Sequence, residues 1–177
     1  MRTPLMLLMS IHPNWTHKII TGLKDIEVRK TIPKSLTQTP FQMFIHCTKD
    51  SKYPLSIREE YGVHYVLPRK SACSEHNLNG RIVGTCLVTE IIPITWDEYN
   101  NCYDISDDDL QRTCLSQEEL LEYGNKKTLY GYVISNLRCF TETYHITKAF
   151  TYNETGDKVS MKSAPQSWSY INGLEVH

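Results

Sequence analysis

One stretch near the N-terminus, residues 10–30, constrains the fold of this chain more than any other. The apolar run of residues 5–11 that leads into it predicts a buried strand. Pro13 suits the first position of a helix, where a missing N–H costs nothing, and Gly22 suits the left-handed cap that ends one. The alternation over residues 25–29 then predicts a second strand. The sequence therefore predicts a strand, a short helix and another strand in immediate succession.

The second strand carries charge in an apolar neighbourhood. Glu27 and Arg29 alternate with apolar residues, and residues two apart on a strand lie on the same side, about 7 Å apart. Lys24 stands in the turn just before, where its long stem reaches the same place. A carboxylate accepts hydrogen bonds from an exocyclic amine, while Lys and Arg bind phosphate or carbonyl oxygen. The three side chains suit a planar, polar ligand such as a nucleotide, although a salt-bridge ladder on a solvated strand gives the same pattern.

Residues 22–29, Gly-Leu-Lys-Asp-Ile-Glu-Val-Arg, resemble the G-x-K-x-x-E-x-R signature of the ASCH family, a branch of the PUA-like β-barrels. The resemblance is good over about the first 35 residues and looser beyond them. It implies an α+β fold, a PUA-like (ASCH) mixed β-barrel with short flanking helices. It also implies a domain that binds RNA or a nucleobase-containing small molecule in the cleft beside Lys24, Glu27 and Arg29.

The same resemblance implies an enzymatic alternative that uses Lys24. Some small ASCH proteins hydrolyse N4-acetylcytidine with a Lys, a Thr and a more distant Glu, and others cleave RNA. In this sequence Glu27 occupies the Thr position, so the route through a hydroxyl nucleophile is closed. Glu27 also opposes the lowered pKa that Lys24 would need for proton transfer. The composition of the site favours binding, with a nucleoside amidohydrolase or a ribonuclease as the alternative.

Further residues are predicted to line the same site. Trp15 or Trp168 would supply a stacking face for a base. Ser10 and His12 lie at the end of the first strand, where the mouth of the cleft is expected, and Gln166 lies with Trp168 on a closing segment. Two of these residues could have a structural role in place of ligand binding. Trp15 also suits a core position beside Ile19 and Ile20, and His12 also suits the start of the helix.

The size and composition of the chain exclude several classes of function. A chain of 177 residues is most simply one domain, and a net charge of −1 excludes a protein that coats nucleic acid by charge alone. No stretch approaches the ~20 apolar residues that span a bilayer. The six cysteines are scattered without a close pair. We therefore expect a cytoplasmic protein with no membrane contact, no metal and no cofactor, and leave its oligomeric state open.

Three segments are expected to extend the single domain of residues 1–177. They are an irregular insertion at 48–79, an acidic insertion at 96–124 and a projecting hairpin at 147–163. In the acidic insertion, Ser106 predicts the start of one helix, and Ser116 with Glu119 predicts the capping box of another. The acidic charge supports a third function, a protein-interaction module in which Asp97–Glu122 docks on a basic partner.

Overall fold

The computed structural model describes residues 5–36, 38–60, 63–68 and 76–175 of the chain. The chain divides into two compact units. Unit 1 contains residues 1–21, 42–86 and 137–177, and unit 2 contains residues 22–41 and 87–136. Two long strands, β7 (Arg81–Asp97) and β9 (Leu129–His145), contribute residues to both units. The single domain indicated by the sequence stays a prediction.

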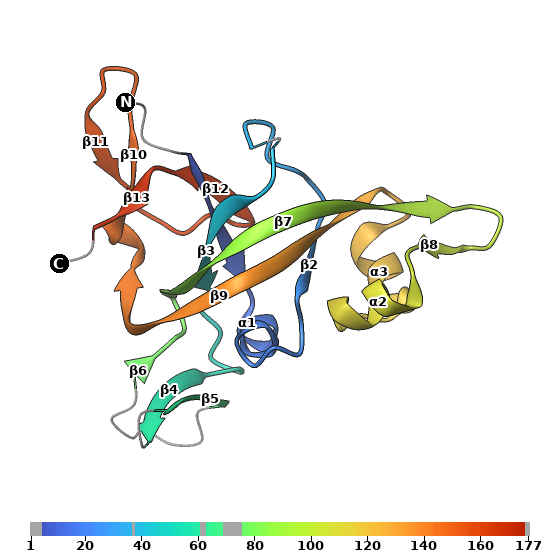
Figure 1. Cartoon of the computed structure of the whole chain (residues 1–177), viewed down its shortest axis with the longest axis horizontal. Helices are drawn as coiled ribbons and strands as arrows, with labels where there is room; N and C mark the ends of the chain where they lie inside the picture. Colours follow the sequence, from blue (N-terminus) through green and yellow to red (C-terminus); the bar gives the residue numbers. More distant parts are fainter. Residues whose placement is uncertain (1–4, 37, 61–62, 69–75, 176–177) are drawn as a thin grey trace. The chain divides into compact units, whose positions relative to one another are not determined.

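The main sheet of unit 1 joins strands from distant parts of the chain (Figure 1). In it, β1 (Met6–Ile11) pairs antiparallel with β12 (Trp168–Ile171) and parallel with β3 (Phe41–Cys47), which is followed by β7. All residues of β1 are buried, which explains why its sequence is apolar at every position except Ser10. The helix α1 (Pro13–Ile20) follows, with Pro13 in its first turn as predicted.

The buried face of α1 differs from the predicted one. Thr16 and Ile19 are buried, whereas Trp15 and Ile20, expected beside Ile19, are only partly buried. Residues three apart lie on the same side of a helix. Thr16 can be buried there because its hydroxyl donates to the Ile11 carbonyl at 3.2 Å. The pattern of polar and apolar residues alone therefore does not predict which face of α1 is buried.

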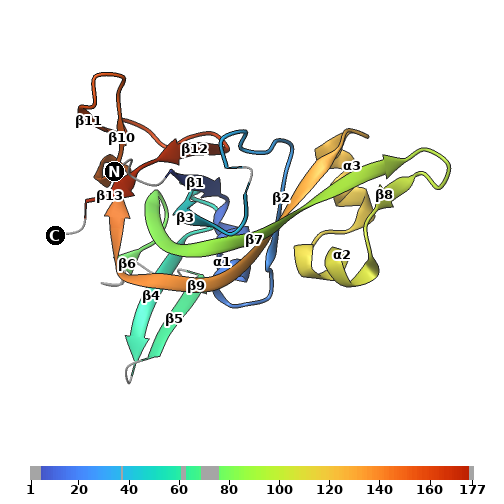
Figure 2. The same cartoon turned by 45° about the horizontal axis from the view of Figure 1, so that its top comes forward.

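Unit 1 also has two three-stranded sheets. In the first, β4 (Leu55–Glu60) forms an antiparallel hairpin with β5 (Val63–Pro68) and pairs with β6 (His76–Asn77) (Figure 2). These strands lie in the segment expected to be irregular, where the charged run of residues 58–60 hides the alternation. In the second, β10 (Ala149–Tyr152) pairs with β11 (Lys158–Ser160) and β13 (Gly173–Leu174). The β10–β11 hairpin corresponds to the turn signal in residues 147–163.

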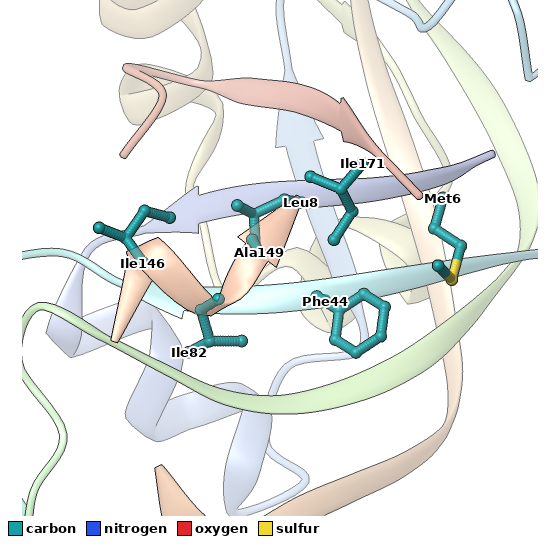
Figure 3. Close-up of a cluster of buried hydrophobic side chains, with 7 residues drawn as sticks. All are labelled: Met6, Leu8, Phe44, Ile82, Ile146, Ala149 and Ile171. Carbon is teal, nitrogen blue, oxygen red and sulfur yellow. The ribbon is translucent and has the colours of Figure 1, made fainter. Parts of the chain in front are cut away.

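A hydrophobic cluster holds the main sheet of unit 1 together (Figure 3). Its side chains come from β1, β3, β7, β12, β10 and the 3-10 turn η1 (Ile146–Lys148). The buried members are Met6, Leu8, Phe44, Ile82, Ile146, Ala149 and Ile171. Because these residues are far apart in sequence, the cluster joins the N-terminal strand to the C-terminal part of the chain.

Unit 2 places β2 (Ile26–Arg29) antiparallel to β9, and the short strand β8 (Cys102–Asp104) antiparallel to β7. The helices α2 (Asp107–Thr113) and α3 (Gln117–Gly124) follow β8 (Figure 1). Ser106 caps α2, and Ser116 with Glu119 forms the predicted capping box of α3. The acidic insertion is thus a strand and two helices.

The core of unit 2 fixes the inner face of β2. Val28 packs in a buried cluster with Ile94, Tyr103, Leu120 and Leu129, so the predicted apolar face of this strand is correct. Glu27, on the other face, is also buried, at 5% exposure. Both faces of this strand are therefore covered, and the charged face has to be satisfied by other polar groups.

In neither unit do the described strands pair into a closed ring, so the closed barrel implied by the resemblance stays a prediction. Among the described residues, no helix is long and apolar enough to cross a membrane.

Gly84 of β7 gives a direct test of strand packing in unit 1. A Cβ atom at this position would lie 2.7 Å from the Arg138 carbonyl oxygen and 3.3 Å from the Cys139 Cα. Both are backbone atoms that cannot rotate away. We expect Gly84→Ala to lower the free energy of unfolding by about 1–3 kcal/mol in urea titrations. Glu90→Ala, at an exposed position of the same strand, is the control; equal stability of both variants would contradict the packing.

Candidate functional site

The three charged residues predicted at the second strand lie together in unit 2, and we refer to them as the charged triad. Glu27 is central: its Oε2 is 3.4 Å from Lys24 Nζ, and its Oε1 is 2.9 Å from Arg29 Nη2. The side chains of Lys24, Glu27 and Arg29 are 2%, 7% and 12% exposed. The three groups therefore meet at a buried point and do not form a ladder on a solvated strand. Their role in ligand binding stays a prediction.

Backbone carbonyls help to hold the ammonium group of Lys24. Its Nζ donates to the Ile26 carbonyl at 2.7 Å and to the Thr113 carbonyl at 2.6 Å. Thr113 is the last residue of α2, where the helix dipole favours a cation. Burial lowers the pKa of Lys24, and the neighbouring Glu27 opposes this shift. Lys24 thus ties the start of β2 to the end of α2 and holds the Glu27 carboxylate.

A second ion-pair network supports the same junction. Arg112 of α2 lies between Asp25, whose Oδ1 is 3.0 Å from its Nε, and Asp109, whose Oδ1 is 2.8 Å from its Nη1. The hydrogen bond that Arg112 donates to Asp25 is the main reason why the pKa of Arg112 is raised. The role of Arg112 is not predictable from the sequence, because its partner Asp25 is 87 residues away. A lone arginine among aspartates was the only local signal.

Tyr123 of α3 contacts the outer end of the charged triad. Burial raises the pKa of the Tyr123 phenol, and the neighbouring Arg29 guanidinium opposes this shift. Lys30 Nζ lies 4.6 Å from the centroid of the Tyr123 ring. Tyr123 nevertheless remains 38% exposed. Neither Tyr123 nor Lys30 is predicted as a site residue from the sequence, because the contact between the strand and the helix is long-range.

The acidic segment Asp97–Glu122 uses several of its carboxylates within unit 2. Asp109 pairs with Arg112, and Glu119 accepts the backbone N–H of Ser116 at 2.8 Å. Asp97 accepts from the backbone N–H of Tyr99 at 2.8 Å. Docking of this segment on a basic partner stays a prediction.

Two of the remaining predicted site residues, Ser10 and His12, belong to unit 1 and make contacts there. Ser10 is 3% exposed, and its Oγ lies 3.2 Å from His46 Nδ1. His12 caps α1 by accepting the Asn14 N–H at 3.3 Å, and its Nε2 lies 2.6 Å from Asp50 Oδ2. His12 therefore acts at the start of the helix, the structural alternative that the sequence indicated.

Both predicted stacking residues also lie in unit 1. Trp15 is partly buried, and Lys18 Nζ lies 4.5 Å from the centroid of its ring. Trp168 lies in β12 with its ring 5.4 Å from that of Tyr170, and Gln166 is exposed just before this strand. Because these residues and the charged triad belong to different units, a shared site stays a prediction.

His46 makes the stability of unit 1 sensitive to acid. Burial lowers the pKa of His46, and a hydrogen bond with the Gly80 backbone opposes this only in part. The unfolded chain therefore binds a proton before the folded chain does. We expect the free energy of unfolding to fall as the pH drops below about 6.5, the ordinary histidine pKa. In urea titrations between about pH 7 and pH 5, His46→Gln should flatten this slope; parallel slopes in wild type and variant would contradict the assignment.

Comparison with known proteins identifies the fold class. The chain has an α+β fold like that of an ASCH protein, mostly β-sheet with short helices, in agreement with the predicted class. One solved structure that shows this is a serine-to-alanine mutant of the ASCH protein from Zymomonas mobilis. It is 12% identical, with a TM-score of 0.53, and the match covers 93% of this chain and 87% of that one.

A crystal structure of ASCH from the same organism matches at 12% identity and a TM-score of 0.49, over 93% of this chain and 86% of that one. No family model and no curated protein sequence matches the chain. At 12% identity, the match to the mutant structure indicates a similar fold and does not carry over an activity.

Proposed function

We propose that this chain binds RNA or a nucleobase-containing ligand at the charged triad. The observation that carries the proposal is the burial of three ionised side chains around one strand. Buried ion pairs lose hydration, and well-packed apolar residues often stabilise a protein as much or more. A buried group with a shifted pKa, as Lys24 has, often marks a functional site. The ASCH-like fold supports the proposal by analogy.

The geometry favours different roles for the three residues. Lys24 donates to two backbone carbonyls and pairs with Glu27, so it acts as a positioning residue. The two oxygens of Glu27 have further lone pairs that accept from a base amine or a ribose hydroxyl. The guanidinium of Arg29 carries five N–H donors and suits a phosphate or carbonyl oxygen. This assignment differs from the sequence expectation that Lys24 contacts the ligand directly.

A thermal-shift screen against nucleosides, nucleotides and short RNAs tests the proposal. A ligand present at about 100 times its Kd adds about 2.7 kcal/mol to the free energy of unfolding. For a chain of this size, that corresponds to a rise of about 5–10 °C in Tm. We expect this rise with base-containing ligands, and we expect mass spectrometry to show that they remain unchanged.

Matched arginine variants connect the shift to the site. Arg29→Gln should abolish the ligand-induced rise in Tm, measured against the Tm of the same variant without ligand. Arg138→Gln, at an exposed position of β9, should keep it. A wild-type protein that none of these ligands stabilises would contradict the proposed function.

The lowered pKa of Lys24 favours a second function, a hydrolase acting on N4-acylated cytidine or on RNA. An amine with a lowered pKa exchanges protons more readily near neutral pH. Formation of deacylated nucleoside or cleaved RNA by the wild type, lost in Lys24→Arg while binding persists, would establish turnover. Binding without any product would exclude it.

A further inference from the structure

We infer that Tyr123 of α3 is the stacking platform of the proposed site and that Lys30 beside it binds a phosphate. The ligand is then a nucleotide that carries a phosphate, not a neutral nucleoside. The inference rests on the proposed function, and it replaces Trp15 and Trp168 as the expected stacking residues. The two lie in unit 1, whereas Tyr123 and Lys30 lie in the same unit as the charged triad.

Tyr123 lies next to the outermost of the buried charges, Arg29. Glu27 Oε2 is 3.4 Å from Lys24 Nζ, and Glu27 Oε1 is 2.9 Å from Arg29 Nη2. The Arg29 guanidinium in turn is close enough to the Tyr123 hydroxyl to oppose the rise in its pKa. The Tyr123 ring is 38% exposed. A rigid aromatic ring beside a guanidinium group suits a stacked base whose polar edge faces the arginine.

The ammonium group of Lys30 interacts with the same ring in the absence of ligand, at 4.6 Å from its centroid. An exposed cation–π contact is weaker than the stacking of a base on an aromatic side chain. A base can therefore displace Lys30, whose exposed stem is flexible. The displaced ammonium remains next to the stacked base, where the phosphate of the same nucleotide can reach it.

The local charge also favours an anionic group. The charges that act on the Tyr123 side chain are the cations Arg29 and Lys30 and the carboxylate of Glu27, so the cations outnumber the anion. Glu119 lies one helical turn before Tyr123, but its Oε2 accepts the Ser116 N–H at 2.8 Å. This hydrogen bond holds the Glu119 carboxylate at the start of α3. A neutral nucleoside has no anionic group that could pair with the ammonium group of Lys30.

The fluorescence of 2-aminopurine, which falls when this base stacks, tests the inference. The probes are 2-aminopurine riboside, its 5′-monophosphate and a short single-stranded RNA that contains it. We expect the wild type to quench the monophosphate and the RNA at concentrations at which the riboside stays bright. Comparison of the monophosphate with the RNA shows whether one nucleotide suffices or a strand is needed.

Tyrosine and lysine variants separate stacking from phosphate binding. Tyr123→Leu should weaken binding about 5- to 150-fold, the equivalent of one lost stacking contact. Tyr123→Phe keeps the ring and should keep the quenching. Lys30→Ala should weaken binding of the monophosphate but not that of the riboside. Tyr99→Leu, which removes a tyrosine 92% exposed in the same unit, is the matched control.

The outcomes distinguish this inference from the proposed function. If Arg29→Gln abolishes binding while folded Tyr123→Leu, checked by its Tm, binds like the wild type, the stacking role is wrong and the proposed function stands. Equal affinity of the wild type for riboside and monophosphate would overturn the phosphate role of Lys30. If the wild type binds none of the three probes, the proposed function fails and the inference fails with it.

Discussion

Replacing Glu27 by alanine is expected to lower the free energy of unfolding by about 3–5 kcal/mol. The carboxylate is shared by Lys24 and Arg29, whose side chains are only 2% and 12% exposed. Its removal leaves two like charges buried near each other with no anion between them, so Coulomb repulsion adds to the loss of hydration. Urea unfolding monitored by circular dichroism measures this loss.

Glu90→Ala provides the control for Glu27→Ala, because Glu90 is an exposed glutamate of β7. Its substitution should change stability by no more than about 0.5 kcal/mol. A loss below about 1 kcal/mol in Glu27→Ala would mean that the charged triad is solvated in solution, contrary to the structure.

Replacing Lys24 by methionine is expected to lower the free energy of unfolding by about 3–5 kcal/mol, because it removes one partner of the buried ion pair with Glu27. Methionine fills similar space but cannot donate to the carbonyls of Ile26 and Thr113, which now receive hydrogen bonds of 2.7 and 2.6 Å. A buried acceptor left unsatisfied costs about 1–3 kcal/mol. Lys127→Met, at an exposed position of unit 2, is the control and should be nearly neutral.

A double-mutant cycle shows whether Lys24 and Glu27 act as a pair. In Lys24→Met combined with Glu27→Leu, the charges of Lys24 and Glu27 disappear together, so the loss should be smaller than the sum of the losses in Lys24→Met and Glu27→Leu. The expected coupling is about 0.5–3 kcal/mol, as for residues in one network. Strictly additive losses would contradict a direct interaction between the two side chains.

The features that the sequence predicts correctly are local ones. Gly22 has a φ of +75°, as its place after α1 requires, and Ser106 and Ser116 cap the helices that follow them. Capping depends on atoms within three residues of one another, so it can be predicted from the sequence alone. The meeting of Lys24 and Glu27, three residues apart, is local in the same sense.

The features that the sequence does not predict depend on long-range contacts. The Thr113 carbonyl that receives a hydrogen bond from Lys24 lies 89 residues along the chain. The ring of Tyr123 reaches Arg29 only because α3 and β2 fold into the same unit. No spacing rule connects such positions. The sequence predicts Trp15 and Trp168 as stacking residues because it shows which residues are aromatic but not which residues are close in space.

The most direct test of the central claim is an NMR titration of the labelled protein with 2-aminopurine 5′-monophosphate. The account predicts that the side-chain signals of Arg29, Lys30 and Tyr123 shift together and give one common Kd. Shifts confined to residues of unit 1 such as Trp15 and Trp168, or no shifts at saturating ligand, would contradict it.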